Sequence, residues 1–294
     1  MRASMVERGA TLEVEVEGPI LWVRLDRPVV LNAYNATMGA ELAQAFDRAD
    51  TDDGIRVVVL TARGRVFCAG ADMSAGSGAF DLTQGAGAGN FGTPGANQGD
   101  FLAAIMRCRK PSIVAFNGPA VGVGLTMTLP CDIRIAAEGA RFGCVFTRRG
   151  LVPEAGSAWF LPRLVGLPTA LRWCLTGAMV PADEALVHGL VSEVVPAEAL
   201  ADRARALALE IATHTSALAV GLTRHLLWRF SADPDPSGAL AHDTRLNVAL
   251  GRTAEVHEGV AAFLEKRPPR FPGRVSADWP AEAPPVPGPS ARRA

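Results

Sequence analysis

Two glycine-containing turns in this chain of 294 residues have the composition of a site that stabilises negative charge. One spans residues 68–72 and the other spans residues 117–126, and each directly follows an apolar run. Glycine lets the backbone approach a ligand closely, and the first N–H groups of a helix are unpaired and partly positive. The N–H groups of Ala71 and Val123 are the two donors that we expect to face one oxygen, as an oxyanion hole. Close packing alone would also account for turns of this kind.

Glu154 is the candidate base that would accompany these donors. It follows Pro153 and stands in the first turn of an expected helix, in a stretch rich in small and apolar residues. One interpretation is favourable contact with the helix dipole, worth about 0.3–1 kcal/mol. The other is a general base whose pKa is raised toward the working pH by burial. The residues alone leave both interpretations open.

The composition argues against several other classes of function. Lys and Arg number 29 against 30 Asp and Glu, so the sequence predicts no basic surface for nucleic acid. No apolar run approaches the roughly 20 residues of a membrane span, and the N-terminus lacks the apolar core of a signal peptide. The five cysteines form no CxxC pair, and the five histidines have no metal-ligand spacing. We therefore expect a cytoplasmic protein with reduced thiols, no metal, and no nucleic-acid or membrane partner.

Short apolar strands and helices must position these residues. Residues 11–16 and 20–25 form a predicted hairpin, and Asn35 caps the helix that follows. Further strands are predicted at residues 55–60, 113–116, 133–136 and 191–195. Short, mostly apolar strands that alternate with helices favour an α/β core with a buried, largely parallel sheet.

The chain divides into a core, a helical segment and a tail. We assign residues 1–196 to the core, with a glycine-rich, mobile insertion at residues 74–100. Residues 197–267 carry four predicted helices with broad apolar faces, at residues 197–214, 216–230, 238–250 and 253–266. Residues 268–294 are rich in Pro, Ala and Arg, which predicts a disordered tail.

The motifs, taken in order, resemble the crotonase (enoyl-CoA hydratase/isomerase) superfamily from about residue 25 to residue 271. The matching motifs are Arg27-Pro28 with Asn32-Ala33, residues 67–72, Lys110-Pro111, residues 117–122, Cys131-Asp132-Ile133, residues 140–143, Glu258-Gly259 and residues 262–267. The resemblance implies a spiral of ββα turns with a C-terminal helical trimerisation segment. It also implies a coenzyme A thioester as substrate, no permanently bound cofactor, and a homotrimer or dimer of trimers. The implied oxyanion hole uses the N–H groups of Ala71 and Val123.

Two departures from the family pattern bear on the reaction. Hydratases of the family carry one glutamate where this chain has Thr126 and a second where it has Phe146. Adding water across a double bond needs one group to activate water and another to deliver a proton. The usual hydration machinery is therefore missing from these two positions.

Glu154 is similar to the catalytic glutamate of peroxisomal-type Δ3,Δ2-enoyl-CoA isomerases, which share a Pro-Glu-x-x-Ser pattern with residues 153–157. The resemblance implies a single acid/base that moves a proton between C2 and C4 in fatty-acid or related acyl-CoA metabolism. Two alternatives stay open. One is an enoyl-CoA hydratase in which Glu154 or another acid activates water, and the other is a non-catalytic acyl-CoA-binding protein.

The remaining site residues are expected to hold the thioester. Ala69, Gly70, Asp72 and Gly122 belong to the two turns. The insertion at residues 74–100, Thr126, Phe146, Trp159 and the C-terminal helices around Phe263 would shape the pocket. Many relatives carry basic residues for coenzyme A where this chain has residues 29–31, which are apolar. Phosphate contacts are therefore expected from Arg27, or from Lys266 and Arg267 of a neighbouring subunit.

Overall fold

The computed structural model describes residues 5–81 and 101–284. Its main sheet has seven strands in the order β1-β2-β3-β4-β5-β7-β10. Their bounds are β1 (Met5–Arg8), β2 (Leu12–Glu17), β3 (Ile20–Leu25), β4 (Val57–Ala62), β5 (Ser112–Phe116), β7 (Ile133–Ala137) and β10 (Glu193–Val195). The first three strands pair antiparallel, and every pairing from β3 to β10 is parallel. The expected hairpin and largely parallel sheet are confirmed, whereas the edge strand β1 was not predicted.

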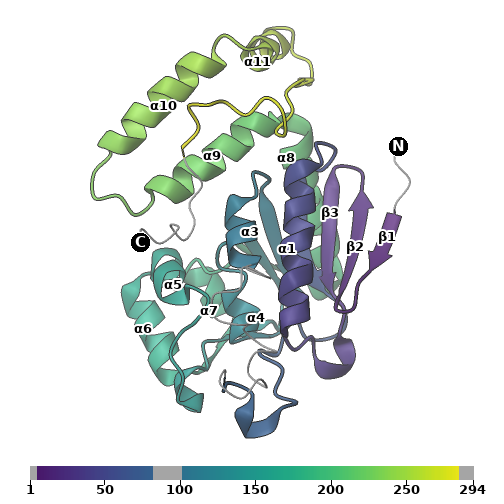
Figure 1. The fold of residues 1–294 in the computed structure, drawn as a ribbon, viewed down its shortest axis with the longest axis vertical. Helices are drawn as coiled ribbons and strands as arrows, with labels where there is room; N and C mark the ends of the chain where they lie inside the picture. Colours follow the sequence, from purple (N-terminus) through teal and green to yellow (C-terminus); the bar gives the residue numbers. More distant parts are fainter. Residues whose placement is uncertain (1–4, 82–100, 285–294) are drawn as a thin grey trace.

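The middle strands are mostly apolar because helices cover both faces of the sheet. In β4, Val58 and Leu60 join the larger hydrophobic cluster, and Val57 and Val59 join a second cluster on the opposite face. Ala204 of α8 (Leu200–His214) packs in that second cluster. Figure 1 shows α1 (Ala36–Thr51) and α3 (Phe101–Arg107) in front of the sheet, with α8 behind it.

The start of α1 agrees with the expected cap. The Asn35 side chain accepts a hydrogen bond from the backbone N–H of Met38 at 3.0 Å. An N-cap of this kind satisfies one of the unpaired donors at a helix start. The α1 helix follows the hairpin and packs against α3, so its apolar face completes the larger cluster.

A second, three-stranded sheet lies near the turns that the sequence singles out. It contains β6 (Ala120–Val121), β8 (Arg141–Gly143) and β9 (Met179–Pro181), in the order β6-β8-β9. Strands of two or three residues are too short to show an alternating pattern, which explains why no signal predicted them. The short α4 (Val123–Thr126) follows β6 directly. The other helices of the core are η1 (Pro28–Val30), η2 (Gly76–Gly78), η4 (Thr147–Arg149), α5 (Ser157–Val165), α6 (Leu167–Thr176) and α7 (Ala182–Val187).

The four predicted C-terminal helices are confirmed. After η5 (Ala197–Ala199) come α8, α9 (Ala217–Phe230), α10 (Ser237–Leu250) and α11 (Ala254–Leu264). Figure 1 places α10 and α11 at one end of the molecule, away from α4 to α7. No single helix among the described residues is long and apolar enough to cross a membrane, although one pair bent by 112°, Ala197–His214 with Ala217–Phe230, meets the length and composition test jointly.

The segment after α11 differs from the expected disordered tail over residues 268–284. Val275 is fully buried, and its carbonyl accepts a hydrogen bond from Arg109 Nη1 at 2.8 Å. The guanidinium of Arg109 also stacks over the Trp279 ring, 5.4 Å from its centroid. The sequence predicted disorder from the overall composition of this segment. Val275 and Trp279 are single apolar residues among Pro, Ala and Arg, so they had little effect on that prediction. Residues 82–100 of the predicted insertion and residues 285–294 lie outside the described part of the chain.

Candidate active site

The two glycine-containing turns meet through a short parallel bridge. Cys68 pairs with Ala120, the N–H of Val121 donates to the Cys68 carbonyl at 3.0 Å, and the N–H of Cys68 donates to the Pro119 carbonyl at 3.1 Å. The bridge ends where both turns begin. Segments some fifty residues apart in the sequence are therefore held side by side at the point where their backbones change direction.

Glycine is required at this meeting point. Gly70 has a φ of +107°, and Gly122 has a φ of +54° with a ψ of −126°, conformations that side chains strongly disfavour. A Cβ atom on Gly70 would also lie 3.2 Å from the Val121 carbonyl oxygen. The two turns can approach each other this closely because neither carries a side chain at the contact.

This arrangement leaves two backbone donors uncommitted. Among the described residues, neither the N–H of Ala71 nor that of Val123 donates a hydrogen bond. Val123 is the first residue of α4, where a helix leaves its N–H groups unpaired. Both residues line the same pocket, so the two donors are available to an oxygen that enters it.

Glu154 reaches this pocket from a loop, which corrects its expected place in the first turn of a helix. The helix α5 begins only at Ser157, whose N–H and hydroxyl both donate to the Glu154 carbonyl, at 2.9 and 2.6 Å. Between them, Ala155 and Gly156 adopt positive φ angles of 53° and 68°. Because the left-handed conformation costs a non-glycine residue about 1 kcal/mol, the turn sets the direction of the Glu154 side chain at some expense. Complementing the helix dipole does not explain a carboxylate placed three residues ahead of the helix.

Thr126 is the direct partner of the Glu154 carboxyl. Its hydroxyl donates to Glu154 Oε1 at 2.5 Å, and its own side chain is fully buried on α4. Burial raises the pKa of Glu154 above the ordinary value, and the hydrogen bond from Thr126 offsets part of that rise. Thr126 therefore brings the carboxyl beside the helix whose first N–H is a candidate oxyanion donor.

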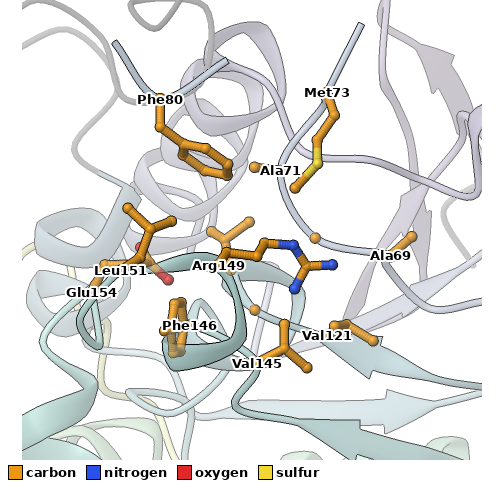
Figure 2. Close-up of a pocket in the computed structure, with 13 residues that line it drawn as sticks. Ala69, Ala71, Met73, Phe80, Val121, Val145, Phe146, Arg149, Leu151 and Glu154 are labelled. Carbon is orange, nitrogen blue, oxygen red and sulfur yellow. The ribbon is translucent and has the colours of Figure 1, made fainter. Parts of the chain in front are cut away.

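A pocket encloses most of the predicted site residues, and its remaining lining is largely apolar (Figure 2). Glu154 is the only carboxylate among the described residues that line it. The predicted residues in the lining are Ala69, Gly70, Ala71, Gly122, Val123, Phe146 and Glu154. Phe146 occupies a buried position where hydratases of the family have an acid, so its ring adds to the apolar wall.

Several predicted binding residues lie outside this lining. The guanidinium of Arg27 forms an ion pair with Asp72 at 3.0 Å and also donates to the Ala33 carbonyl, which ties the first turn to the segment before α1. Trp159 stacks against neighbouring aromatic rings, with the Arg163 guanidinium 4.0 Å above its ring centroid. Phe263, with 82% of its surface exposed, lies in the last turn of α11, and Lys266 follows the helix two residues after its end. Figure 1 places α11 at the end of the molecule away from α4 to α7.

The sequence reasoning missed more than a third of the lining. Phe80 belongs to the insertion that was expected to shape the pocket, whereas the missed residues are Met73, Val121, Val145, Arg149 and Leu151. The apolar members carry no signal by themselves, since any of them would suit a core. Arg149 had a usable signal, because it is the second of two consecutive arginines in a segment flanked by Phe146 and Leu151.

A family model, related sequences and solved structures all place this chain in the same family. The enoyl-CoA hydratase/isomerase family matches residues 15–274. A probable enoyl-CoA hydratase from Rhodobacter capsulatus is 40% identical over 265 residues, covering 90% of this chain and 98% of its own. A 1,2-epoxyphenylacetyl-CoA isomerase from Escherichia coli is 36% identical over 270 residues, covering 88% of this chain and 97% of its own. The crystal structure of a probable enoyl-CoA hydratase/isomerase from Mycobacterium abscessus superimposes with a TM-score of 0.79 at 32% identity, over 92% of this chain and all of the other.

Proposed function

We propose that this chain, which belongs to the enoyl-CoA hydratase/isomerase family, is a Δ3,Δ2-enoyl-CoA isomerase with Glu154 as its single acid/base. The observation that carries the proposal is the Glu154 carboxylate, the only one in the described lining, which Thr126 holds on the helix that begins at Val123. The family acts on coenzyme A thioesters, and the reaction needs no further cofactor.

The proposed reaction begins at C2 of a 3-enoyl thioester. The Glu154 carboxylate takes a proton from C2, and the electron pair moves through the thioester carbonyl to give a dienolate. The dienolate oxygen rests between the N–H groups of Ala71 and Val123. Glu154, now protonated, returns the proton to C4, so the double bond moves from C3–C4 to C2–C3 and the base is regenerated. One acid and one pair of donors complete the cycle.

The raised pKa of Glu154 supports its role in both half-reactions. A carboxylate with a higher pKa is a stronger base toward C2, and general catalysis is most efficient when the pKa lies near the working pH. Each backbone donor to a developing oxyanion is typically worth about 3–4 kcal/mol in the transition state. The apolar lining strengthens both effects because it keeps water from the reacting atoms.

The decisive experiment replaces Glu154 and follows solvent hydrogen. Wild-type protein incubated with 3-hexenoyl-CoA in deuterated water should form 2-hexenoyl-CoA that carries deuterium at C2 or C4, with no addition of water. Glu154→Gln keeps the shape and still accepts the Thr126 hydroxyl, so it should bind the thioester but lose about 1,000-fold or more in turnover, the scale on which acid–base groups contribute. Glu138→Gln is the control, since Glu138 is exposed beyond the end of β7. Unchanged turnover in Glu154→Gln would refute the assignment.

Hydration is the second candidate, because several relatives are named as hydratases, including enoyl-CoA hydratase ACTT3 of Alternaria alternata at 40% identity. In that case Glu154 would activate water against a 2-enoyl thioester. Crotonyl-CoA would then gain the mass of one water with wild-type protein and fail to do so with Glu154→Gln. Thioester binding without deuterium exchange or water addition would instead favour a non-catalytic acyl-CoA-binding protein.

We also propose that the protein assembles as a homotrimer, or as a dimer of trimers, through its C-terminal helices. Large apolar side chains on α10 and α11 are exposed in the single chain, among them Leu240, Val260, Phe263 and Leu264. Large exposed apolar surface marks contact sites on soluble proteins, and an assembly through α10 and α11 would bury these side chains. Whether Lys266 and Arg267 reach a neighbouring subunit's thioester depends on this assembly.

A further inference from the structure

Arg149 brings a positive charge into a pocket whose lining is otherwise almost entirely apolar. It is the last residue of η4, and Gly150 follows with a φ of +69°, so the chain turns sharply after it. Figure 2 shows its side chain extending across the pocket, from the side of Leu151 and Glu154 toward the side of Ala69 and Val121. Arg149 and Glu154 are the only charged residues in the described lining.

The guanidinium of Arg149 has no polar partner among the described residues. Within residues 5–81 and 101–284 it forms neither a hydrogen bond nor an ion pair, and it lies beyond ion-pair distance of Glu154. Its neighbour Arg148 differs, because Arg148 Nε donates to the Thr176 carbonyl at 2.9 Å. One member of the pair thus anchors η4 to the end of α6, and the other projects into the pocket.

An unpaired guanidinium in such a place is suited to an anion. Arg keeps its charge at all ordinary pH values, and its planar fork matches a carboxylate with two parallel hydrogen bonds. The Arg149 side chain is exposed in the free protein, so the attraction becomes stronger than in water only when an acyl chain fills the apolar pocket beside Met73, Phe80 and Leu151. Glu154 does not supply the anion, since no ion pair joins it to Arg149 in the described part of the chain and its Oε1 accepts from the Thr126 hydroxyl instead.

We propose that Arg149 binds a free carboxylate on the acyl chain, so that the preferred substrates are thioesters of dicarboxylic acids. The inference rests on the proposed function, because it places the acyl chain in the pocket that holds Glu154. A neutral acyl chain would leave the guanidinium without a partner against apolar surface, whereas a second carboxylate would pair with it. Arg149 is then a specificity-determining residue, and the proton transfer stays with Glu154.

Binding of saturated thioesters tests this separately from turnover. Succinyl-, adipoyl- and suberoyl-CoA are compared by calorimetry with butanoyl-, hexanoyl- and octanoyl-CoA, so that each pair differs by the free carboxylate. We expect at least one dicarboxylic member to bind about tenfold more tightly than its neutral partner, which corresponds to about 1.4 kcal/mol. Arg149→Leu should bring that ratio close to one, and Arg149→Lys should keep part of it because the charge stays while the fork is lost.

The controls separate the pocket charge from other sources of attraction. Arg148→Leu should retain the wild-type ratio, since that side chain is engaged with Thr176. Arg149→Gln provides a second neutral variant, and thermal melting establishes that each variant is folded. The proposal is overturned if no dicarboxylic thioester is preferred by wild-type protein. It is also overturned if Arg149→Leu weakens both members of a pair equally, which would assign the guanidinium to the coenzyme A phosphates. Because none of these ligands reacts, failure of the isomerase assignment would leave the binding ratios unaffected.

Discussion

Glu154 works as a carboxylate in surroundings that favour its neutral form. Burial raises its pKa in the folded chain, so the folded state holds the proton more tightly than the unfolded chain does. The contribution of Glu154 to the free energy of unfolding is therefore fully present only below the pKa that this side chain has in the unfolded chain. That contribution falls as pH rises from the unfolded pKa through the folded pKa. The protein accepts this cost in order to keep a reactive base in an apolar pocket, and Thr126 limits it by donating to the charged form.

Thr126→Val tests that positioning role. The change conserves shape and removes the one hydrogen bond that stabilises the Glu154 carboxylate, so the pKa of Glu154 should rise further. Because turnover requires the carboxylate, the acidic limb of the kcat/KM profile should move to higher pH, with about a tenfold loss at the pH where wild type is half-active. Thr128→Val is the matched control, since the Thr128 hydroxyl donates to the Leu125 carbonyl at 2.7 Å instead. An equal loss at every pH would argue for a purely structural role of Thr126.

At the scale of elements, the segment that follows α11 acts as a strap between the C-terminal helices and the core. Arg109 forms an ion pair with Asp50 at 2.6 Å while it also contacts Val275 and Trp279. The Trp279 ring packs edge-on against the buried His225, at a centroid distance of 5.2 Å. Residues far apart in the sequence thus share one contact surface.

Trp279→Ala should loosen this strap. The substitution removes the ring that covers Arg109 and His225, and a half-buried Trp is worth about 2 kcal/mol of stability. We expect a lower melting temperature and faster amide hydrogen exchange over residues 268–284, measured by mass spectrometry. Trp279→Phe keeps an aromatic ring, so its loss of stability should be less than half of that caused by Trp279→Ala. If exchange in this segment is already at the unfolded rate in wild type, the strap contributes nothing.

At the scale of the whole molecule, Figure 1 places α10 and α11 at the end away from α4, whose first residue, Val123, lines the pocket. The groups proposed for catalysis, Glu154, Ala71 and Val123, all belong to one chain and to one pocket. Assembly would therefore cover the C-terminal helices without being needed to complete the proton-transfer site.

If the chain assembles as proposed, the particle mass in solution should be three times the chain mass of 30.8 kDa, or six times that mass for a dimer of trimers. Phe263→Glu puts a charge on a side chain that is 82% exposed in the single chain and should shift the mass measured by light scattering toward the monomer. Val187→Glu alters a similarly exposed residue on α7 and should leave the mass unchanged. A wild-type mass of 30.8 kDa at every concentration would contradict the proposed trimer.

Local pattern was enough to predict six of the seven strands of the main sheet, all but the edge strand β1, and the four C-terminal helices. Each strand is a short apolar or alternating run, and each helix has apolar residues at helical spacing. Val57 to Leu60, for example, are consecutive apolar residues that face the two sides of the sheet in turn. The two turns were visible for the same reason, because glycine after a strand is a local signal. Strands as short as β6 and β9 carry no period and could not be predicted.

What the sequence by itself determined is therefore six strands of the main sheet, α1 and the four C-terminal helices, the two glycine-containing turns and the candidate acid Glu154. Only the tertiary structure decided that Thr126 meets Glu154, which follows it by 28 positions, and that Arg149 rather than Arg148 projects into the pocket. Neither fact has a local cause. Both depend on a loop with Ala155 and Gly156 at positive φ and on a glycine contact between two turns, and such contacts exist only after distant segments have packed together.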